Sequence, residues 1–349
     1  MGPQTGQGDR MGQGRNEPRE GPLRVVHPDR EARGRQGQGQ RVSPALSHLI
    51  LFNPTSGRGR SQEVAMALHR AIRLAGHDAL MIPAAQADEL SGHPAAGDLA
   101  LFIVGGDGTV HRSLDVARRH NRAIYHVPMG TENLFAREFG MTGDLDLAVR
   151  SLNRPRFRTI DLASCTHDGQ APRTFALMCS VGPDAGVIRR LAARRTGPIR
   201  HTSYVVPIAH ELLDPHLPML TIEADGGTLV RHEAGMVVVA NSRHYAMRLD
   251  PAHGAEMSDG LLDLIFFPAR SRVELLTHLL AARWRRAHEN PGVIHRRVRE
   301  VRVTSPEANT PSQLDGEAGR TVPDAPGLDL RVRVLPAAAR VLLPAWADR

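Results

Sequence analysis

The stretch Leu99-Ala-Leu-Phe-Ile-Val-Gly-Gly-Asp-Gly-Thr109 decides the fold that the sequence predicts. It opens with an apolar run that is typical of a buried strand and turns at once into glycine. Turn formation alone needs one or two glycines, whereas Gly105, Gly106 and Gly108 crowd into this turn. The extra glycines indicate a ligand that lies against the backbone, and a polyphosphate is the best candidate. Asp107 could orient Mg²⁺ or a ribose, or it could cap the helix that follows.

Strands and helices alternate around this stretch. The expected elements are strands at 47–52, 78–82, 99–104 and 123–127, and helices at 61–75, 109–119 and from about 132. Short connections between alternating elements predict a doubly wound α/β domain over residues 46–156. In such folds ligands bind at the carboxyl ends of the strands.

Two further turns follow strand ends. The first, Asn53-Pro-Thr-Ser-Gly-Arg-Gly-Arg60, combines small residues with two arginines and suits an anion, or it is an ordinary turn with a Ser61 helix cap. The second, Pro128-Met-Gly-Thr-Glu-Asn133, offers the polar groups of Thr131 and Asn133, or a Thr131 cap. Neither these turns nor the stretch at 105–109 is a Rossmann or Walker motif. Three such turns at the ends of three strands nevertheless predict one convergent nucleotide site.

The composition excludes other classes of function. The 349 residues carry 44 Lys and Arg against 37 Asp and Glu, a formal charge of +7, and every basic residue is arginine. Without lysine there is no Schiff base, no pyridoxal anchor and no Walker lysine. Two cysteines, Cys165 and Cys179, form no CxxC pair and no disulfide scaffold, so a reducing cytoplasm is expected. We expect neither a transmembrane helix nor a secretory signal, because the sequence shows no apolar run of the length required.

The positive charge does not indicate nucleic acid. Residues 1–45 hold eight Arg and five Asp or Glu, a net charge of +3, so the other 304 residues carry an ordinary +4. This Gly-, Gln- and Arg-rich tail is expected to be disordered, because it cannot bury enough apolar area. An RNA-binding tail is disfavoured because no aromatic residues interleave with its arginines. We therefore expect no nucleic-acid partner.

The alternation stops near residue 157. Strands are expected at 157–163, 174–179, 219–224, 235–240, 261–267, 298–304 and 328–334, and helices near 186–195, 203–213 and 271–287. This pattern predicts a largely antiparallel second domain over residues 157–345. Two acidic clusters stand out in it, Glu256-Met-Ser-Asp-Gly-Leu-Leu-Asp263 and Leu314-Asp-Gly-Glu317. Both could also be plain turns, because Asp-Gly is a common hairpin signal.

With these motifs the sequence resembles the diacylglycerol kinase catalytic-domain family, which includes bacterial diacylglycerol kinases, related lipid kinases and sphingosine kinases. The resemblance spans about residues 46–345. The motifs occur in the family's order: NPTSG at 53–57, GGDGTV at 105–110, PMGTEN at 128–133, VGPDA at 181–185, DGLLD at 259–263 and LDGE at 314–317. NAD kinases and phosphofructokinases share GGDGT, but the combination is more specific. The resemblance implies a phosphofructokinase-like α/β domain and a β-sandwich, with ATP and lipid meeting between them.

The resemblance also implies an activity and site residues. It implies an ATP- and Mg²⁺-dependent lipid kinase in which Asp315 is the general base, with Asp107 and Glu317 as further catalytic residues. It implies a structural Mg²⁺ site at Glu256, Asp259 and the backbone carbonyl of Leu261. The implied ATP-binding residues are Asn53, Pro54, Thr55, Ser56, Gly57, Gly105, Gly106, Asp107, Gly108, Thr109, Val110, His111, Gly130, Thr131 and Asn133. Arg58 and Arg60 could replace the missing lysine, because a guanidinium binds phosphate through two N–H groups.

The sequence departs from the family at three places. His111-Arg112 stands where many members have Asn-Glu, Leu134 where many have Asp, and Pro83-Ala-Ala85 where many have a threonine. These changes bear on substrate identity and on some ATP contacts. Two alternatives stay open beside the lipid kinase: a small-molecule kinase such as a NAD kinase, which does not explain NPTSG or LDGE, and a non-catalytic nucleotide- or lipid-binding relative.

A lipid substrate implies a cytoplasmic protein that is peripheral at the inner membrane face. Residues 271–288 mix apolar side chains with arginines, so this segment could lie at a bilayer surface or pack on its own core with its arginines in solvent. The arginines of residues 189–200 are a second candidate. The identity of the lipid and the oligomeric state stay open, with a homodimer possible.

Overall fold

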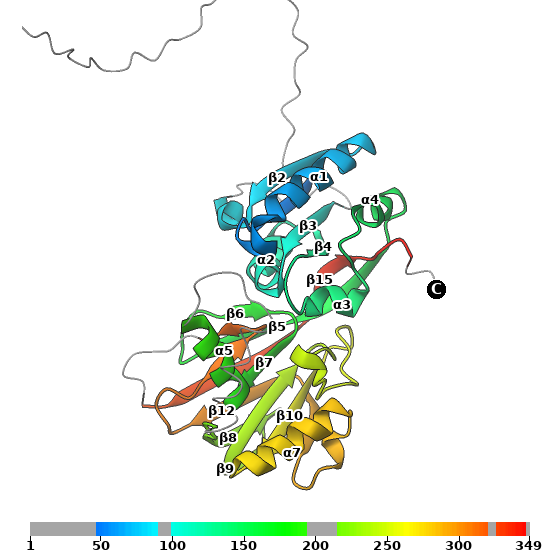
Figure 1. Ribbon diagram of the computed structural model, residues 1–349. Helices are drawn as coiled ribbons and strands as arrows, with labels where there is room; N and C mark the ends of the chain where they lie inside the picture. Colours follow the sequence, from blue (N-terminus) through cyan, green and yellow to red (C-terminus); the bar gives the residue numbers. More distant parts are fainter. Residues whose placement is uncertain (1–46, 90–98, 194–214, 320–325, 347–349) are drawn as a thin grey trace, which may run out of the picture. The chain divides into compact units, whose positions relative to one another are not determined.

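The computed structural model describes residues 47–89, 99–193, 215–319 and 326–346 (Figure 1). Its first region is built on a parallel sheet in the order β2-β1-β3-β4. The strands are β1 (His48–Phe52), β2 (Ala79–Pro83), β3 (Ala100–Gly105) and β4 (Ala123–Pro128). Every residue of β1 and β3 is buried, as expected for central strands of a parallel sheet.

Helices join these strands as the sequence predicted, with one difference. The helices are α1 (Ser61–Leu74), α2 (Asp107–Arg119), α3 (Leu134–Phe139) and α4 (Leu145–Asn153), with 3₁₀ turns η2 (Ser56–Gly59) and η3 (Ala84–Glu89). The helix predicted from about 132 is two helices. Gly140 ends α3 in a left-handed conformation (φ 69°), and the Asp144 carboxylate begins α4 by accepting from the N–H groups of Asp146 and Leu147.

The second region is a β-sandwich. Its strands are β5 (Phe157–His167), β6 (Arg173–Phe175), β7 (Met178–Val181), β8 (Met219–Ala224), β9 (Gly227–Ala240), β10 (Leu262–Pro268), β11 (Ile294–Val298), β12 (Glu300–Ser305), β13 (Ser312–Leu314), β14 (Glu317–Ala318) and β15 (Leu328–Leu342). Its helices are α5 (Pro183–Ala193) and α7 (Arg272–Arg283), with 3₁₀ turns η4 (Ala246–Arg248) and η5 (Ala287–Glu289). The predicted strand at 174–179 is two strands, and β11, β13 and β14 were not predicted.

Two antiparallel layers enclose the sandwich core. One layer runs β6-β5-β15-β12-β8, and the other runs β14-β13-β7-β9-β10-β11. Strand β9 belongs to both, because its first half pairs with β8 and its second half with β7 and β10. It changes layers near Gly235, where a Cβ atom would collide with the carbonyl oxygen of Phe267. Apolar side chains from both layers form one buried cluster.

The last strand ties the two regions together. Strand β15 pairs with β12 and β5 in the sandwich, and Arg340 and Val341 near its end pair in parallel with β4. The sequence predicted this strand only to residue 334. Its register shifts between Leu335 and Ala339, around Pro336, which has no N–H to give to a ladder. All described residues belong to one compact unit, so contacts between the two regions are part of the fold.

Some predictions fall on residues that the structure does not describe. These are the tail at 1–45, the helix at 203–213 and the arginines of residues 194–200. In the described ranges, no helix has the length and apolar character that crossing a membrane requires.

Candidate active site

The three glycine-containing turns meet at the carboxyl ends of β1, β3 and β4. A Cβ atom on Gly130 would lie 2.8 Å from the Cα atom of Gly106, and one on Gly57 would collide with the side chain of Met129. These contacts join the turn at 128–133 to the turn at 105–109 and to the turn at 53–60. The missing side chains therefore let three backbone segments approach one another, and they leave the region lined by backbone groups.

Asparagine side chains shape two of these turns. The Asn133 Oδ1 atom accepts from the N–H of Gly130 (2.8 Å), and its Nδ2 donates to the carbonyl of Gly130 (2.9 Å). The Asn53 Oδ1 atom accepts from the N–H and the hydroxyl of Thr55 (3.2 and 2.9 Å). Both amides hold their own turns closed, so the sequence prediction that they bind ATP directly gains no support from these contacts.

The remaining predicted ATP-binding residues lie in the same turns or just behind them. Ser56 donates its N–H to the carbonyl of Asn53 (2.9 Å). Thr109 and Val110 are each 2 % exposed in the first turn of α2, so they form its base rather than its surface. Pro54 and Thr131 belong to the turns themselves, and Gly105 is the last residue of β3.

The helix caps differ from those that the sequence offered as alternatives to ligand binding. Helix α1 has Arg60 at its N-cap, and the Ser61 hydroxyl instead donates to the carbonyl of Asn53. Helix α3 has Asn133 at its N-cap rather than Thr131. Asp107 does cap a helix, but not its own: its Oδ1 atom accepts from the N–H of Phe135 in α3 (3.1 Å). Asp107 thereby fixes the turn at 105–109 to the helix that follows the turn at 128–133.

Asp315 is a buried carboxylate surrounded by donors. Its side chain is 2 % exposed. Its Oδ1 atom accepts from the N–H groups of Leu177 and Met178 (2.8 and 3.0 Å), and its Oδ2 accepts from the N–H of Ala176 (2.8 Å). The same Oδ2 lies 3.0 Å from Nδ1 of His111. Hydrogen bonds from three backbone N–H groups fix the orientation of this side chain.

The backbone explains how this carboxylate reaches that position. Asp315 and Gly316 both have positive φ (49° and 81°) and form the two-residue turn between β13 and β14. Positive φ at both central residues is the signature of a type I′ hairpin turn. The LDGE cluster is thus a hairpin turn, one of the two interpretations that the sequence allowed. Its aspartate also points into the site.

His111 connects this carboxylate to an arginine that sequence reasoning missed. The Nε2 atom of His111 lies 3.0 Å from a guanidinium nitrogen of Arg173 on β6. A guanidinium can only donate, so Nε2 accepts and Nδ1 carries the proton that it donates to Asp315. Arg173 was missed because it follows an ordinary turn and carries no motif. Only the pairing of β5 with β6 brings it to the site.

Arg112, which also departs from the family pattern, contacts the hairpin that carries LDGE. Arg112 donates to the carboxylate of Glu317 (2.9 Å). The same Glu317 oxygen would collide with a Cβ atom on Gly108. His111 and Arg112 on α2 therefore match Asp315 and Glu317 on the β13–β14 hairpin one to one. The two changes from the family pattern are complementary to the acidic turn that they face.

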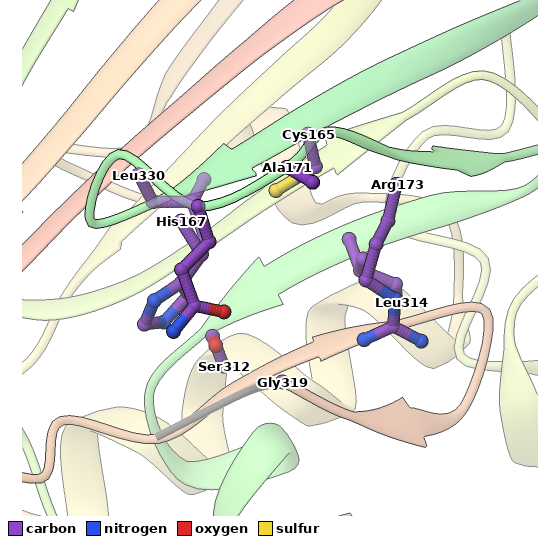
Figure 2. A pocket seen from close by; sticks show the side chains of 9 residues that line it. Cys165, His167, Ala171, Arg173, Ser312, Leu314, Gly319 and Leu330 are labelled. Carbon is purple, nitrogen blue, oxygen red and sulfur yellow. The ribbon is translucent and has the colours of Figure 1, made fainter. Parts of the chain in front are cut away.

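A small recess lies beside this network. Figure 2 shows it between the β5–β6 hairpin and β13, with Arg173 and Leu314 on one side and His167 and Ser312 on the other. Its enclosed volume of about 10 Å³ suits one water molecule at most. Arg173 is therefore packed against β13 as well as bonded to His111.

The predicted structural metal site contains an ion pair. Asp259 Oδ1 accepts from the N–H of Leu261 (2.9 Å), and Oδ2 contacts the guanidinium of Arg297. The side chain of Glu256 is exposed. The described ranges contain no group of three His, Cys, Asp or Glu side chains placed to hold a metal. This donor set does not fit a cation at Asp259, because a guanidinium already lies against its second oxygen.

One more buried acid lies in the sandwich. Asp184, in the VGPDA segment, accepts from the hydroxyls of Ser180 and Tyr245. Burial raises the pKa of Asp184 above its ordinary value, and burial together with the neighbouring carboxyl raises that of Tyr245. Both hydroxyls donate to the same oxygen, Oδ2, and no hydrogen bond reaches the buried Oδ1 atom from the described residues.

A glycine-lined α/β domain joined to a β-sandwich, with a buried carboxylate where they meet, defines a phosphotransferase of the kinase class. Residues 47–165 match the diacylglycerol kinase catalytic domain, and residues 178–343 match the YegS C-terminal NAD kinase beta sandwich-like domain. Residues 47–165 thus belong to the diacylglycerol kinase catalytic-domain family, and kinases of this family use ATP.

Named relatives agree with this membership. The chain is 28 % identical over 300 residues to a diacylglycerol kinase of Mycobacterium tuberculosis, which covers 84 % of this chain and 94 % of that protein. A crystal structure of a diacylglycerol kinase from Bacillus anthracis superposes with a TM-score of 0.64 at 15 % identity, covering 87 % of this chain and 99 % of that one. The structural likeness supports the fold.

Proposed function

We propose that this protein transfers the γ-phosphate of ATP to the hydroxyl of a lipid, with diacylglycerol or a related lipid alcohol as substrate. The observation that carries the proposal is the contact between His111, which follows the glycine-rich turn, and Asp315, which lies in the sandwich. A proton acceptor and a phosphate-binding backbone thus lie at one site. Phosphoryl transfer needs that combination of positioning and charge stabilisation.

The nucleotide side of the site consists of backbone groups. Gly57, Gly106 and Gly130 allow N–H groups and helix ends to lie against phosphates without a lysine. Arg58 on η2 and Arg60 directly after it are exposed in the turn at 53–60 and supply the nearby positive charge.

The residues present also fit a nucleotide-bound Mg²⁺ at Asp107. A single carboxylate together with phosphate oxygens is the usual protein share of such a site. Asp107 uses Oδ1 to hold α3, and no hydrogen bond to Oδ2 is found among the described residues. When bound, the ion would neutralise charge on the phosphates.

The acceptor side is the pair of Asp315 and His111. All four contacts of the Asp315 carboxylate are taken by protein donors, so a lipid hydroxyl reaches the pair through Nε2 of His111. As the hydroxyl oxygen attacks the γ-phosphorus, its proton passes to Nε2, the bond from phosphorus to the β–γ bridging oxygen breaks, and ADP leaves. Asp315 stabilises the imidazolium that forms. Arg173, released from Nε2, stays close enough to neutralise the transferred phosphoryl group.

A substrate panel tests the proposal. The protein is incubated with ATP labelled in the γ-phosphate and Mg²⁺, and with diacylglycerol, monoacylglycerol, sphingosine or NAD. Label on a lipid alcohol supports the proposal. Label on NAD alone would identify a small-molecule kinase, and ATP binding without any labelled product would identify a non-catalytic relative.

A further inference from the structure

Helix α7 carries apolar side chains on two opposite faces. Its inner face buries Leu275, His278 and Ala282. His278 donates from Nε2 to the carbonyl of Pro268 at the end of β10 (2.8 Å) and accepts at Nδ1 from Asn290 (3.0 Å). These contacts account for one side of the helix and fix its orientation on the sandwich, where Figure 1 shows it lying along β10.

The outer face is an apolar stripe in solvent. Val273, Leu276, Leu280 and Trp284 are 63 %, 37 %, 61 % and 72 % exposed. At about 100° per residue they fall within about 80° of arc, opposite the buried face. Among the residues that the structure describes, seven large apolar side chains are exposed, and four of them lie on this stripe. Such a concentration on one helix indicates a surface that is covered in use.

Arginines border the stripe. Arg272 and Arg283 lie within about 40° of Leu276 around the helix, on the side away from Glu274. Arg270, Arg285 and Arg286 stand at the two ends of the helix. The nearby acids are fewer: Glu289 pairs with Arg286, Asp250 lies 3.9 Å from Arg285, and Glu274 accepts from the N–H of Arg270. The face is therefore apolar with a positive border.

This charge distribution indicates which kind of surface covers the stripe. Two copies packed stripe to stripe with antiparallel helices would bring Arg272 and Arg283 of one copy against the same arginines of the other, which is unfavourable. An anionic bilayer accepts both features, because the arginines meet lipid phosphates while the apolar side chains enter the acyl boundary. Tryptophan is also the side chain most typical of the membrane interface.

We propose that the outer face of α7 docks the protein on the surface of an anionic lipid bilayer. The inference deepens the proposed function and rests on it, since a lipid substrate is what brings the protein to a bilayer. In this proposal α7, rather than the catalytic site, attaches the protein to the membrane.

Trp284 allows a direct test. The chain has two tryptophans, so Trp346→Phe leaves Trp284 as the only tryptophan fluorophore. Vesicles of phosphatidylcholine mixed with phosphatidylglycerol are expected to shift its emission to the blue and to sediment the protein, and pure phosphatidylcholine vesicles are not. Added salt is expected to weaken the binding. Neither ATP nor diacylglycerol is present, so a protein without lipid kinase activity would still bind.

Matched variants separate the stripe from general surface effects. Arg272→Gln and Arg283→Gln should each weaken vesicle binding about fivefold, and Leu276→Ser with Leu280→Ser should weaken it further. Met66→Ser with Leu74→Ser, on the exposed side of α1, should change nothing. Equal binding to neutral vesicles, or binding unaffected by the α7 variants, would overturn the proposal. A blue shift without lipid that grows with protein concentration would assign the face to a second copy instead.

Discussion

The Nδ1 atom of His111 lies 3.0 Å from the Oδ2 atom of Asp315, although 204 positions separate the two residues in the sequence. The contact crosses from the first helix turn after the glycine-rich strand end to a hairpin of the sandwich. It joins a residue that departs from the family pattern to the residue that the resemblance implies as general base. Proton transfer at this site is therefore a property of the pair.

His111→Asn tests the pair directly. Asparagine is the residue that many family members have at this position, so the fold should accept it. The asparagine amide cannot take up the proton that Nε2 of the imidazole accepts. We therefore expect kcat to fall about 10²- to 10⁴-fold, the usual contribution of a positioned acid or base. The pH profile of kcat should change shape as well.

His120→Asn is the matched control for that variant. His120 is also buried and follows the last turn of the same helix, but it contacts neither Asp315 nor Arg173 in the described structure. It should keep normal activity. Full activity in His111→Asn would mean that Asp315 receives the proton without the imidazole.

Gly130→Ala tests the meeting of the turns. Its Cβ atom would lie 2.8 Å from the Cα atom of Gly106, which is backbone and cannot rotate away. We expect a loss of about 1–3 kcal/mol of folding stability, as for other overpacked sites, together with weaker ATP binding. Gly143→Ala is the control, because nothing lies within 4 Å of its Cβ position. Equal Tm and equal ATP affinity in the two variants would show that the turns do not need this close approach.

Local patterns in the sequence were enough to predict the first region. An apolar run that ends in Asn53-Pro54 marks β1, and one that ends in Gly105-Gly106 marks β3. The strands of the parallel sheet lie within one or two residues of their predicted bounds. The break between α3 and α4 was missed, although Gly140 and Asp144 carry its signals. An Asp in front of a short helical repeat is the cap that identifies α4.

The site depends on contacts that no local pattern contains. Arg173 reaches His111 only through the pairing of β5 and β6, and Asp315 reaches it only because β13 pairs with β7. Strands as short as β13 and β14 give almost no periodic signal. The ion pair of Asp259 and Arg297 likewise follows from the register of β10 against β11.

The Asp259–Arg297 pair should behave as an ion pair without metal. A double-mutant cycle with Asp259→Ala and Arg297→Ala should give a coupling of about 0.5–1 kcal/mol, because Arg297 is half exposed. Chelation with EDTA in the absence of nucleotide should leave Tm unchanged. A Tm that falls on chelation and recovers with Mg²⁺ would restore the metal site implied by the resemblance.

Acid should destabilise the first region through His48. Burial, assisted by His77 and Arg122, lowers the pKa of His48 from 6.5 to about 4, and its Nδ1 atom accepts from the N–H of Ala100. The folded state thus prefers the neutral ring, while the unfolded chain takes up the proton below pH 6.5. This preference costs nothing above pH 6.5 and removes up to about 3 kcal/mol of stability as the pH falls to about 4.

His48→Asn isolates that effect. Asparagine keeps an acceptor for the N–H of Ala100 but does not titrate in this range. Urea denaturation at pH 7 and pH 4 should show a smaller loss of stability in the variant than in the parent. Equal losses would assign the acid sensitivity to other buried histidines, such as His126, whose pKa burial also lowers.

The central claim is most directly tested by transfer of labelled γ-phosphate to a lipid alcohol by Asp315→Asn, compared with Asp225→Asn. Asp225 is a structural match: it has positive φ (46°), precedes a glycine in the hairpin between β8 and β9, and accepts from the N–H groups of Arg299 and Glu300. Asp315 is buried and Asp225 is exposed, so Asp315→Asn should lower Tm more, and transfer is compared at a temperature at which both variants are folded. We predict that Asp315→Asn lowers transfer about 10³- to 10⁴-fold while Asp225→Asn keeps it near the parent rate. Transfer by Asp315→Asn at the rate of Asp225→Asn would contradict the account.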